Sequence, residues 1–134
     1  MAEVRVEGND IVVRLGTFEA LVTFRRQVRV PLASLRMVQV EGSPMTGVPL
    51  LLVPGLAWAK SFAVGCSRKG GRREFVAVYA HRPAVVVDAE GARWDRLVIS
   101  QRDAGAMAAE LATMLLGRAP GNPARRGAFR APLE

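Results

Sequence analysis

Residues 73–100 read REFVAVYAHRPAVVVDAEGARWDRLVIS, and this stretch decides the fold class. It contains three runs rich in β-branched and aromatic residues, at 73–80, 84–88 and 94–100, and such runs are typical of strands. Short turn segments built around Pro83 and Gly91 separate them. Because a parallel crossover needs a dozen or more residues, connections this short predict antiparallel strands.

The segment before this stretch adds a further strand. Trp58 to Cys66 is apolar and alternating, and it leads into Ser67-Arg-Lys-Gly-Gly-Arg-Arg73. The pair Gly70-Gly71 is a strong signal for a two-residue hairpin. Residues 58–100 are therefore expected to form a four-stranded antiparallel meander.

The N-terminal half is less regular but still β-rich. Its expected strands are short β-branched runs, and they lie at 4–7, 11–15, 28–32 and 37–41. The turn residues Gly8-Asn9-Asp10 join the first two into a hairpin. Between the hairpin and the third strand, Phe18, Leu21 and Val22 have helical spacing. We expect a short helix or an irregular segment near 17–26, with Thr17 as its cap.

The C-terminal helix is the clearest element of the sequence. Met107, Leu111, Met114 and Leu115 repeat at i, i+4, i+7 and i+8 and give one apolar stripe. Asp103 is a suitable N-cap and Gly117 a suitable C-cap, so the helix is expected at about 103–116. This one-sided helix must pack on another element, and it completes a single domain at 1–117. The remainder, 118–134, is rich in Arg, Pro and Gly without periodicity, which predicts a disordered basic tail.

Composition narrows the class of protein. The chain has 134 residues, enough for one hydrophobic core, and a formal net charge of +7. Seventeen of its basic residues are Arg and two are Lys. No export signal is recognisable, and the apolar run 48–59 is interrupted by Pro and Gly and is too short to span a membrane. We therefore expect a cytoplasmic protein without a transmembrane segment.

Several segments resemble the small bacterial pleckstrin-homology-like (PH-like) proteins of actinobacterial type. The matching segments are Val28-Arg-Val-Pro-Leu-Ala-Ser-Leu, Pro83-Ala-Val-Val-Val-Asp, Arg96-Leu-Val-Ile-Ser and the helix that follows. The resemblance implies a mainly β fold, with a PH-like barrel of about seven antiparallel strands in two orthogonal sheets and a capping C-terminal α-helix. Members of this superfold bind phosphoinositides, peptides or protein partners. Their lipid-binding hairpin loop is basic, whereas Glu7-Gly-Asn-Asp10 is acidic here.

Two segments are candidates for binding. The first is the basic hairpin, which could hold an anionic lipid headgroup or nucleic acid with help from the tail. Alternatively, its charges only keep a turn soluble. Its residues are Arg68, Lys69, Arg72 and Arg73.

The second candidate is the apolar loop at 45–58, which is too rich in Pro and Gly to be one regular element. It either folds back over an open end of the barrel or projects as an adhesive patch for an unknown protein partner or a second copy. The candidate interaction patch consists of Leu50, Leu51, Leu52, Val53, Leu56 and Trp58.

No catalytic, metal or cofactor site is expected. His81 is the only imidazole and Cys66 the only thiol, so the chain offers neither a catalytic triad nor a four-ligand metal set. The sequence thus predicts a non-catalytic binding or scaffolding module, acting through protein–protein interaction or self-association. The alternative is an anion-binding module using the 68–73 hairpin and the basic tail.

Overall fold

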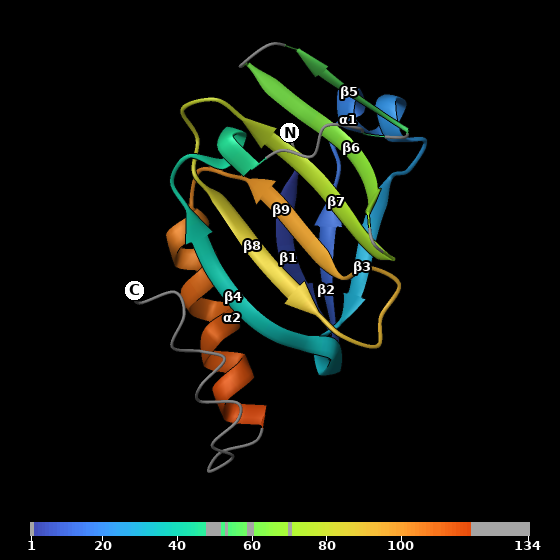
Figure 1. The fold of residues 1–134 in the computed structure, drawn as a ribbon. Coiled ribbons are helices and arrows are strands. Elements are labelled where there is room, and N and C mark those ends of the chain that lie inside the picture. Colours follow the sequence, from blue (N-terminus) through green and yellow to red (C-terminus); the bar gives the residue numbers. More distant parts are fainter. Residues whose placement is uncertain (1, 48–51, 53, 59–60, 70, 119–134) are drawn as a thin grey trace.

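The computed structural model describes residues 2–47, 52, 54–58, 61–69 and 71–118. The described part forms two β-sheets and a long C-terminal helix (Figure 1). The elements in chain order are β1 (Glu3–Glu7), β2 (Asp10–Arg14), α1 (Thr17–Thr23), β3 (Gln27–Pro31), η1 (Leu32–Ser34), β4 (Leu35–Glu41), η2 (Pro44–Gly47), β5 (Gly55–Trp58), β6 (Phe62–Lys69), β7 (Arg72–Tyr79), β8 (Ala84–Ala89), β9 (Arg96–Ser100) and α2 (Ala104–Arg118).

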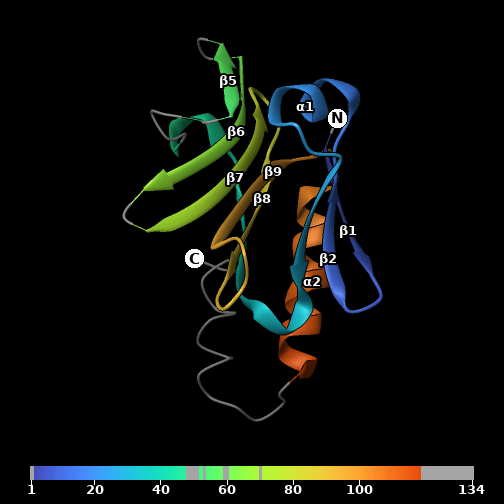
Figure 2. The same cartoon turned by 90° about the vertical axis from the view of Figure 1, so that its right-hand side faces the viewer.

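The two sheets face each other, as the rotated view in Figure 2 shows. The smaller sheet has the order β1-β2-β3, and the larger has the order β4-β8-β9-β7-β6-β5. Helix α2 lies against β4 and β8. It also lines a surface hollow together with β1, so it closes the side of the sandwich between β1 and β4.

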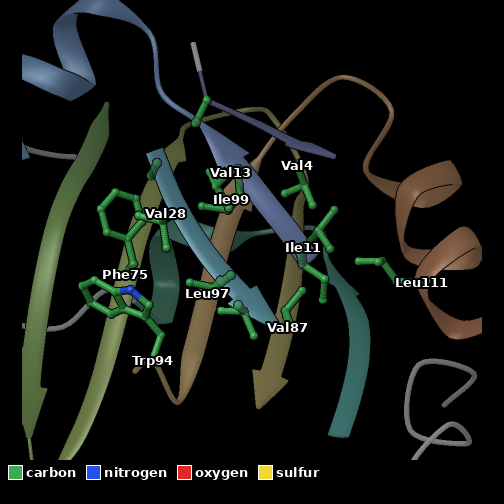
Figure 3. Close-up of a cluster of buried hydrophobic side chains, with 14 of the residues drawn as sticks. Val4, Ile11, Val13, Val28, Phe75, Val87, Trp94, Leu97, Ile99 and Leu111 are labelled. Carbon is green, nitrogen blue, oxygen red and sulfur yellow. The ribbon is translucent and has the colours of Figure 1, made fainter. Parts of the chain in front are cut away.

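The hydrophobic core fills the space between the sheets (Figure 3). Alternate residues of each strand point inward, as the two-residue period of a strand requires. Ile11 and Val13 face it from the small sheet, Leu97 and Ile99 from β9, and Leu111 from α2. Burying a side chain of this size stabilises the fold by about 1.5–3 kcal/mol.

The expected mainly β fold with two sheets and a C-terminal helix is confirmed, whereas no closed barrel is found and the expected all-antiparallel meander is wrong. The described strands form two separate sheets rather than a closed barrel, and they number nine instead of about seven. Strand β9 lies between β7 and β8 and runs parallel to β7, with Phe75 opposite Leu97. A short connection makes two consecutive strands antiparallel. This holds here, because the chain reverses direction from β7 to β8 and again from β8 to β9. Because β7 and β9 are two steps apart in the chain, they become parallel neighbours without any crossover.

The strand expected from Trp58 to Cys66 is confirmed only from Phe62, where β6 begins, because Trp58 ends a separate strand, β5, that pairs with β6. Trp58 pairs with Phe62, and Gly55 pairs with Gly65. The two glycines allow an unusually close approach of the strands. A Cβ on Gly65 would lie 2.6 Å from the Cα of Gly55, and only a residue without a side chain fits there.

The helices agree with the periodicity in the sequence. Helix α2 confirms the element expected at about 103–116, and α1 falls inside the 17–26 segment. The N-cap of α1 is Gly16 rather than Thr17, and the Gly16 N–H donates to the Glu19 carboxylate at 2.7 Å. The expected basic tail lies outside the described residues, apart from Arg118. Within the described part, no helix combines the length and the apolar character needed to cross a bilayer.

Candidate functional site

The ladder between β6 and β7 divides the basic hairpin between two faces of the sheet. Arg68 pairs with Arg73, and Lys69 pairs with Arg72. Directly opposed residues share a face, so Arg68 and Arg73 point to the inner side, where Phe75 is buried. Arg72 points to the outer side and lies 3.8 Å from the carboxylate of Asp88. The side chain of Lys69 lies outside the described part.

A third arginine joins the inner pair from a distant segment. Arg25 follows α1, and its guanidinium carbon lies 5.0 Å from the ring centroid of Trp94. The guanidinium carbon of Arg73 lies 5.1 Å from the same centroid. Such distances allow cation–π attraction, which fixes where both charged groups sit.

These side chains line a partly enclosed cavity of about 360 Å³, which we call the arginine pocket. Its basic residues are Arg25, Arg68 and Arg73, and Trp94 and Cys66 form part of its wall. Trp94 is itself fixed by edge-to-face packing on Phe75, with 5.6 Å between ring centroids (Figure 3). The volume is at the lower end of the range for small-molecule sites.

The charges of the arginine pocket are not neutralised by the described part of the chain. Elsewhere arginines lie close to acids, for example Arg96 to Asp88 at 2.7 Å and Arg29 to Asp10 at 2.9 Å. Among the described residues, none forms an ion pair with Arg25, Arg68 or Arg73.

The pKa of the Cys66 thiol is affected by its position in the wall of the same cavity. Burial raises the pKa of Cys66, because the thiolate loses hydration, and the nearby Arg25 opposes this effect. Cys66 is therefore a neutral thiol at physiological pH, and it adds no negative charge to the arginine pocket.

The residues of the candidate apolar patch do not share one surface. Leu50, Leu51 and Val53 lie outside the described residues. Leu52 is half-buried and packs on the outer face of the large sheet, against a cluster that includes Val76 and Val78. By contrast, Leu56 pairs with Val64, a core residue of the inner face, and is 45% exposed.

Leu56 and Trp58 form a second candidate site together with α1. Phe18 of α1 packs edge-to-face on Phe62, the ladder partner of Trp58, with 5.4 Å between centroids. Helix α1 thus lies beside β5 at one end of the molecule (Figure 1). We call the exposed apolar side chains of this end the α1–β5 surface. They are Phe18, Leu21, Phe24, Leu56 and Trp58.

The most exposed residue of this surface has a strained backbone. Phe24 ends α1 with φ of 59°, in the left-handed region, and its side chain is 85% exposed. Glycine or asparagine usually occupies such a position, since a bulky side chain there is unfavourable. A large apolar residue that is both strained and exposed points to a functional role rather than a packing role.

A buried carboxylate that the sequence did not indicate anchors α1. Glu19 is 1% exposed and accepts hydrogen bonds from the Ala2 and Gly16 N–H groups, at 2.8 and 2.7 Å, and from the Tyr79 hydroxyl. Burial and this hydrogen bond raise the pKa of Tyr79. Glu19 therefore fixes the helix to β7 and to the N-terminal segment, which is a structural role.

The other candidate reactive groups are dispersed. His81 is exposed in the turn between β7 and β8, far along the chain from Cys66. Across the described residues, no three His, Cys, Asp or Glu side chains gather where they could hold a metal ion. Comparison of the chain with protein-family models, with curated proteins and with solved structures gives no significant match to any of them.

Proposed function

We propose that this protein is a non-catalytic interaction module that binds an extended segment of another protein along β5. The observation that carries the proposal is the position of Leu56 and Trp58. Both lie on the inner face of an edge strand, 45% and 67% exposed, at a place where α1 does not cover them. Exposed apolar groups of this kind usually mark a contact surface.

The free edge of β5 supports an extended ligand. Strand β5 is the last strand of the large sheet, and no described strand pairs with its outer edge. Unpaired N–H and C=O groups on such an edge accept an added strand, and alternate side chains of that strand give specificity. An added strand would place every second side chain beside Leu56 and Trp58.

Charge favours a different protein over a second copy of this chain. Arg26 lines the open hollow that Leu21 and Phe24 also line, and so does Arg14, which is paired with Glu7 at 3.0 Å. In a two-fold dimer through this surface, the basic residues of one copy would approach those of the other, and the net charge of each chain is +7. A partner with apolar residues at alternate positions and acidic residues beside them fits both features.

The order of elements supports a distant relation to PH-like proteins. Two β-sheets followed by one C-terminal helix agree with that resemblance, whereas the parallel pair of β7 and β9 departs from an antiparallel barrel. A cytoplasmic location remains part of the proposal. The interaction itself depends on the α1–β5 surface and not on this relationship.

Peptide selection tests the proposal and does not require the partner to be identified. A library of random peptides displayed on phage is selected against the protein, and the enriched peptides are titrated in solution. We expect alternating apolar residues with acidic neighbours. In NMR spectra, the largest shift changes should fall on the backbone amides of Leu56 to Trp58 and on α1.

The chain provides a matched control for this experiment. Leu56→Asp combined with Trp58→Asp should abolish binding, because charged side chains then face the ligand. Val40→Asp changes a residue that is 43% exposed on β4, the opposite edge of the same sheet, and should bind normally. Peptides that bind all variants equally would refute the assignment. If light scattering shows that the wild type is a dimer and the double variant a monomer, the ligand of this surface is a second copy of the chain and not another protein.

A further inference from the structure

We infer that the arginine pocket is a binding site for a phosphate group. This inference is independent of the proposed strand addition, since it rests on the opposite end of β6 and on a different set of side chains. Three arginines line it, two from the β6–β7 hairpin and one from the distant segment after α1, and none is paired with a carboxylate in the described part of the chain.

The convergence of like charges is the first argument. Arg25 and Arg73 are both held about 5 Å from the centre of the Trp94 ring, at 5.0 and 5.1 Å. Gathering positive charges in a partly enclosed cavity costs electrostatic free energy unless an anion is bound. Within the described residues, Asp95 forms no ion pair with these guanidinium groups, and its carboxylate instead accepts the backbone N–H of Arg73 at 2.8 Å.

Preorganisation is the second argument. Trp94 is 2% exposed, so its ring is a fixed platform on which the guanidinium groups of Arg25 and Arg73 rest. Fixing long side chains before the ligand arrives reduces the entropy lost on binding. The pKa of Cys66 is raised, so the thiol in the wall stays neutral and does not compete with an anionic ligand.

The number of donors favours phosphate as the ligand chemistry. A carboxylate has two oxygens and is satisfied by one arginine fork, whereas a terminal phosphate presents three acceptor oxygens. Arg25, Arg68 and Arg73 offer three forks. The cavity volume of about 360 Å³ leaves room for the group that carries the phosphate.

Titration with inorganic phosphate tests the site directly. The indole N–H signal of Trp94 is followed by NMR as phosphate is added at constant ionic strength. We expect a saturable shift in the wild type. Replacing one arginine by Gln should weaken phosphate binding about tenfold or more, since a hydrogen bond between charged groups is lost.

The basic hairpin itself supplies the control. Arg25→Gln, Arg68→Gln and Arg73→Gln should each weaken binding, whereas Arg72→Gln removes the same charge from the other face and should not. Circular dichroism checks that every variant is folded, and the exposed Arg68 is the change least able to disturb the fold. An absent or unsaturable shift in the wild type, or equal loss in all four variants, would overturn the inference.

Vesicles distinguish two sources of the phosphate. Sedimentation with phosphatidylglycerol vesicles, compared with phosphatidylcholine vesicles, is measured for the wild type, Arg73→Gln and Arg72→Gln. Binding to the anionic vesicles that is lost only in Arg73→Gln assigns the site to a lipid headgroup. A phosphate-dependent Trp94 shift without vesicle binding assigns it to a soluble phosphorylated compound.

Discussion

The two ends of the sandwich differ in how completely their inner face is covered. At one end, the 15 residues of α2 lie over β4 and β8, and Leu111 and Leu115 are buried. At the other end, the seven residues of α1 cover part of β6 and leave Leu56 and Trp58 of β5 exposed. The same sheet is therefore sealed at one side and open at the other.

This difference separates residues that stabilise the fold from residues that are free to bind. At the sealed end, apolar side chains contribute to the free energy of folding because they leave water. At the open end, the same residue types contribute little to stability, and their apolar area remains available to a ligand. Substitutions at the two ends should therefore have opposite effects on stability and on binding.

The largest effect is expected at the sealed end. Leu111→Ala should lower the free energy of unfolding by about 3 kcal/mol, because it leaves a cavity between α2 and the sheets. Urea denaturation followed by circular dichroism measures this loss. The variant should keep its affinity for selected peptides at temperatures where it is folded. A loss below about 1 kcal/mol would mean that α2 does not seal this end.

An intermediate effect is expected where α1 is anchored. Tyr79→Phe removes the hydrogen bond to the buried carboxylate of Glu19 and should cost about 2 kcal/mol at neutral pH. The pKa of Tyr79 is raised above its usual 10.0 in the folded protein, so the neutral phenol is favoured by folding. The stabilisation that the protonated Tyr79 gives to the folded protein is complete below pH 10.0. It is lost as the pH rises above 10.0, because the phenol loses its proton in the unfolded chain before it does so in the folded protein.

Urea denaturation between pH 8 and about 11 measures the alkaline part of this prediction. Wild-type stability should fall more steeply than that of Tyr79→Phe once the pH exceeds the usual tyrosine pKa. Parallel curves for the two proteins would show that the buried pair of Glu19 and Tyr79 does not anchor α1.

The smallest effect on stability is expected at the open end. Leu56→Ser and Trp58→Ser should each change the free energy of unfolding by no more than about 0.5 kcal/mol. Val64→Ala, at the buried ladder partner of Leu56, should cost about 2 kcal/mol and serves as the reference. If the two serine variants unfold as readily as Val64→Ala, the α1–β5 surface is part of the core.

The sequence predicted elements whose pattern is long and local. Helix α2 was found close to its expected limits, because four apolar residues define one face, but it continues to Arg118, so Gly117 lies inside the helix and is not its C-cap. The hairpin of β6 and β7 follows from its Gly70-Gly71 dipeptide. Such patterns predict the structure correctly because they depend only on residues that are close together in the sequence.

The missed features depend on residues far apart or on weak turn signals. Trp58 and Phe62 are separated by Ala-Lys-Ser, which contains no Gly, Pro or Asn, so the β5–β6 hairpin read as one strand. Nothing local shows that β9 lies beside β7. The arginine pocket was half predicted, since Arg68 and Arg73 are in the hairpin, but Arg25 and Trp94 join it only through the tertiary fold.

The central place of β9 in the large sheet has a consequence for the order of events in folding. Strands β5, β6 and β7 form one continuous set and β4 and β8 another, and only β9 joins them. A ribosome releases residues 96–100 after the other described strands, so the growing chain holds two unjoined half-sheets until that moment. Pairings across such sequence separations slow folding, because chain entropy must be lost before the contacts form. The large sheet can thus form as one unit only after β9, the last of its described strands, has been synthesised.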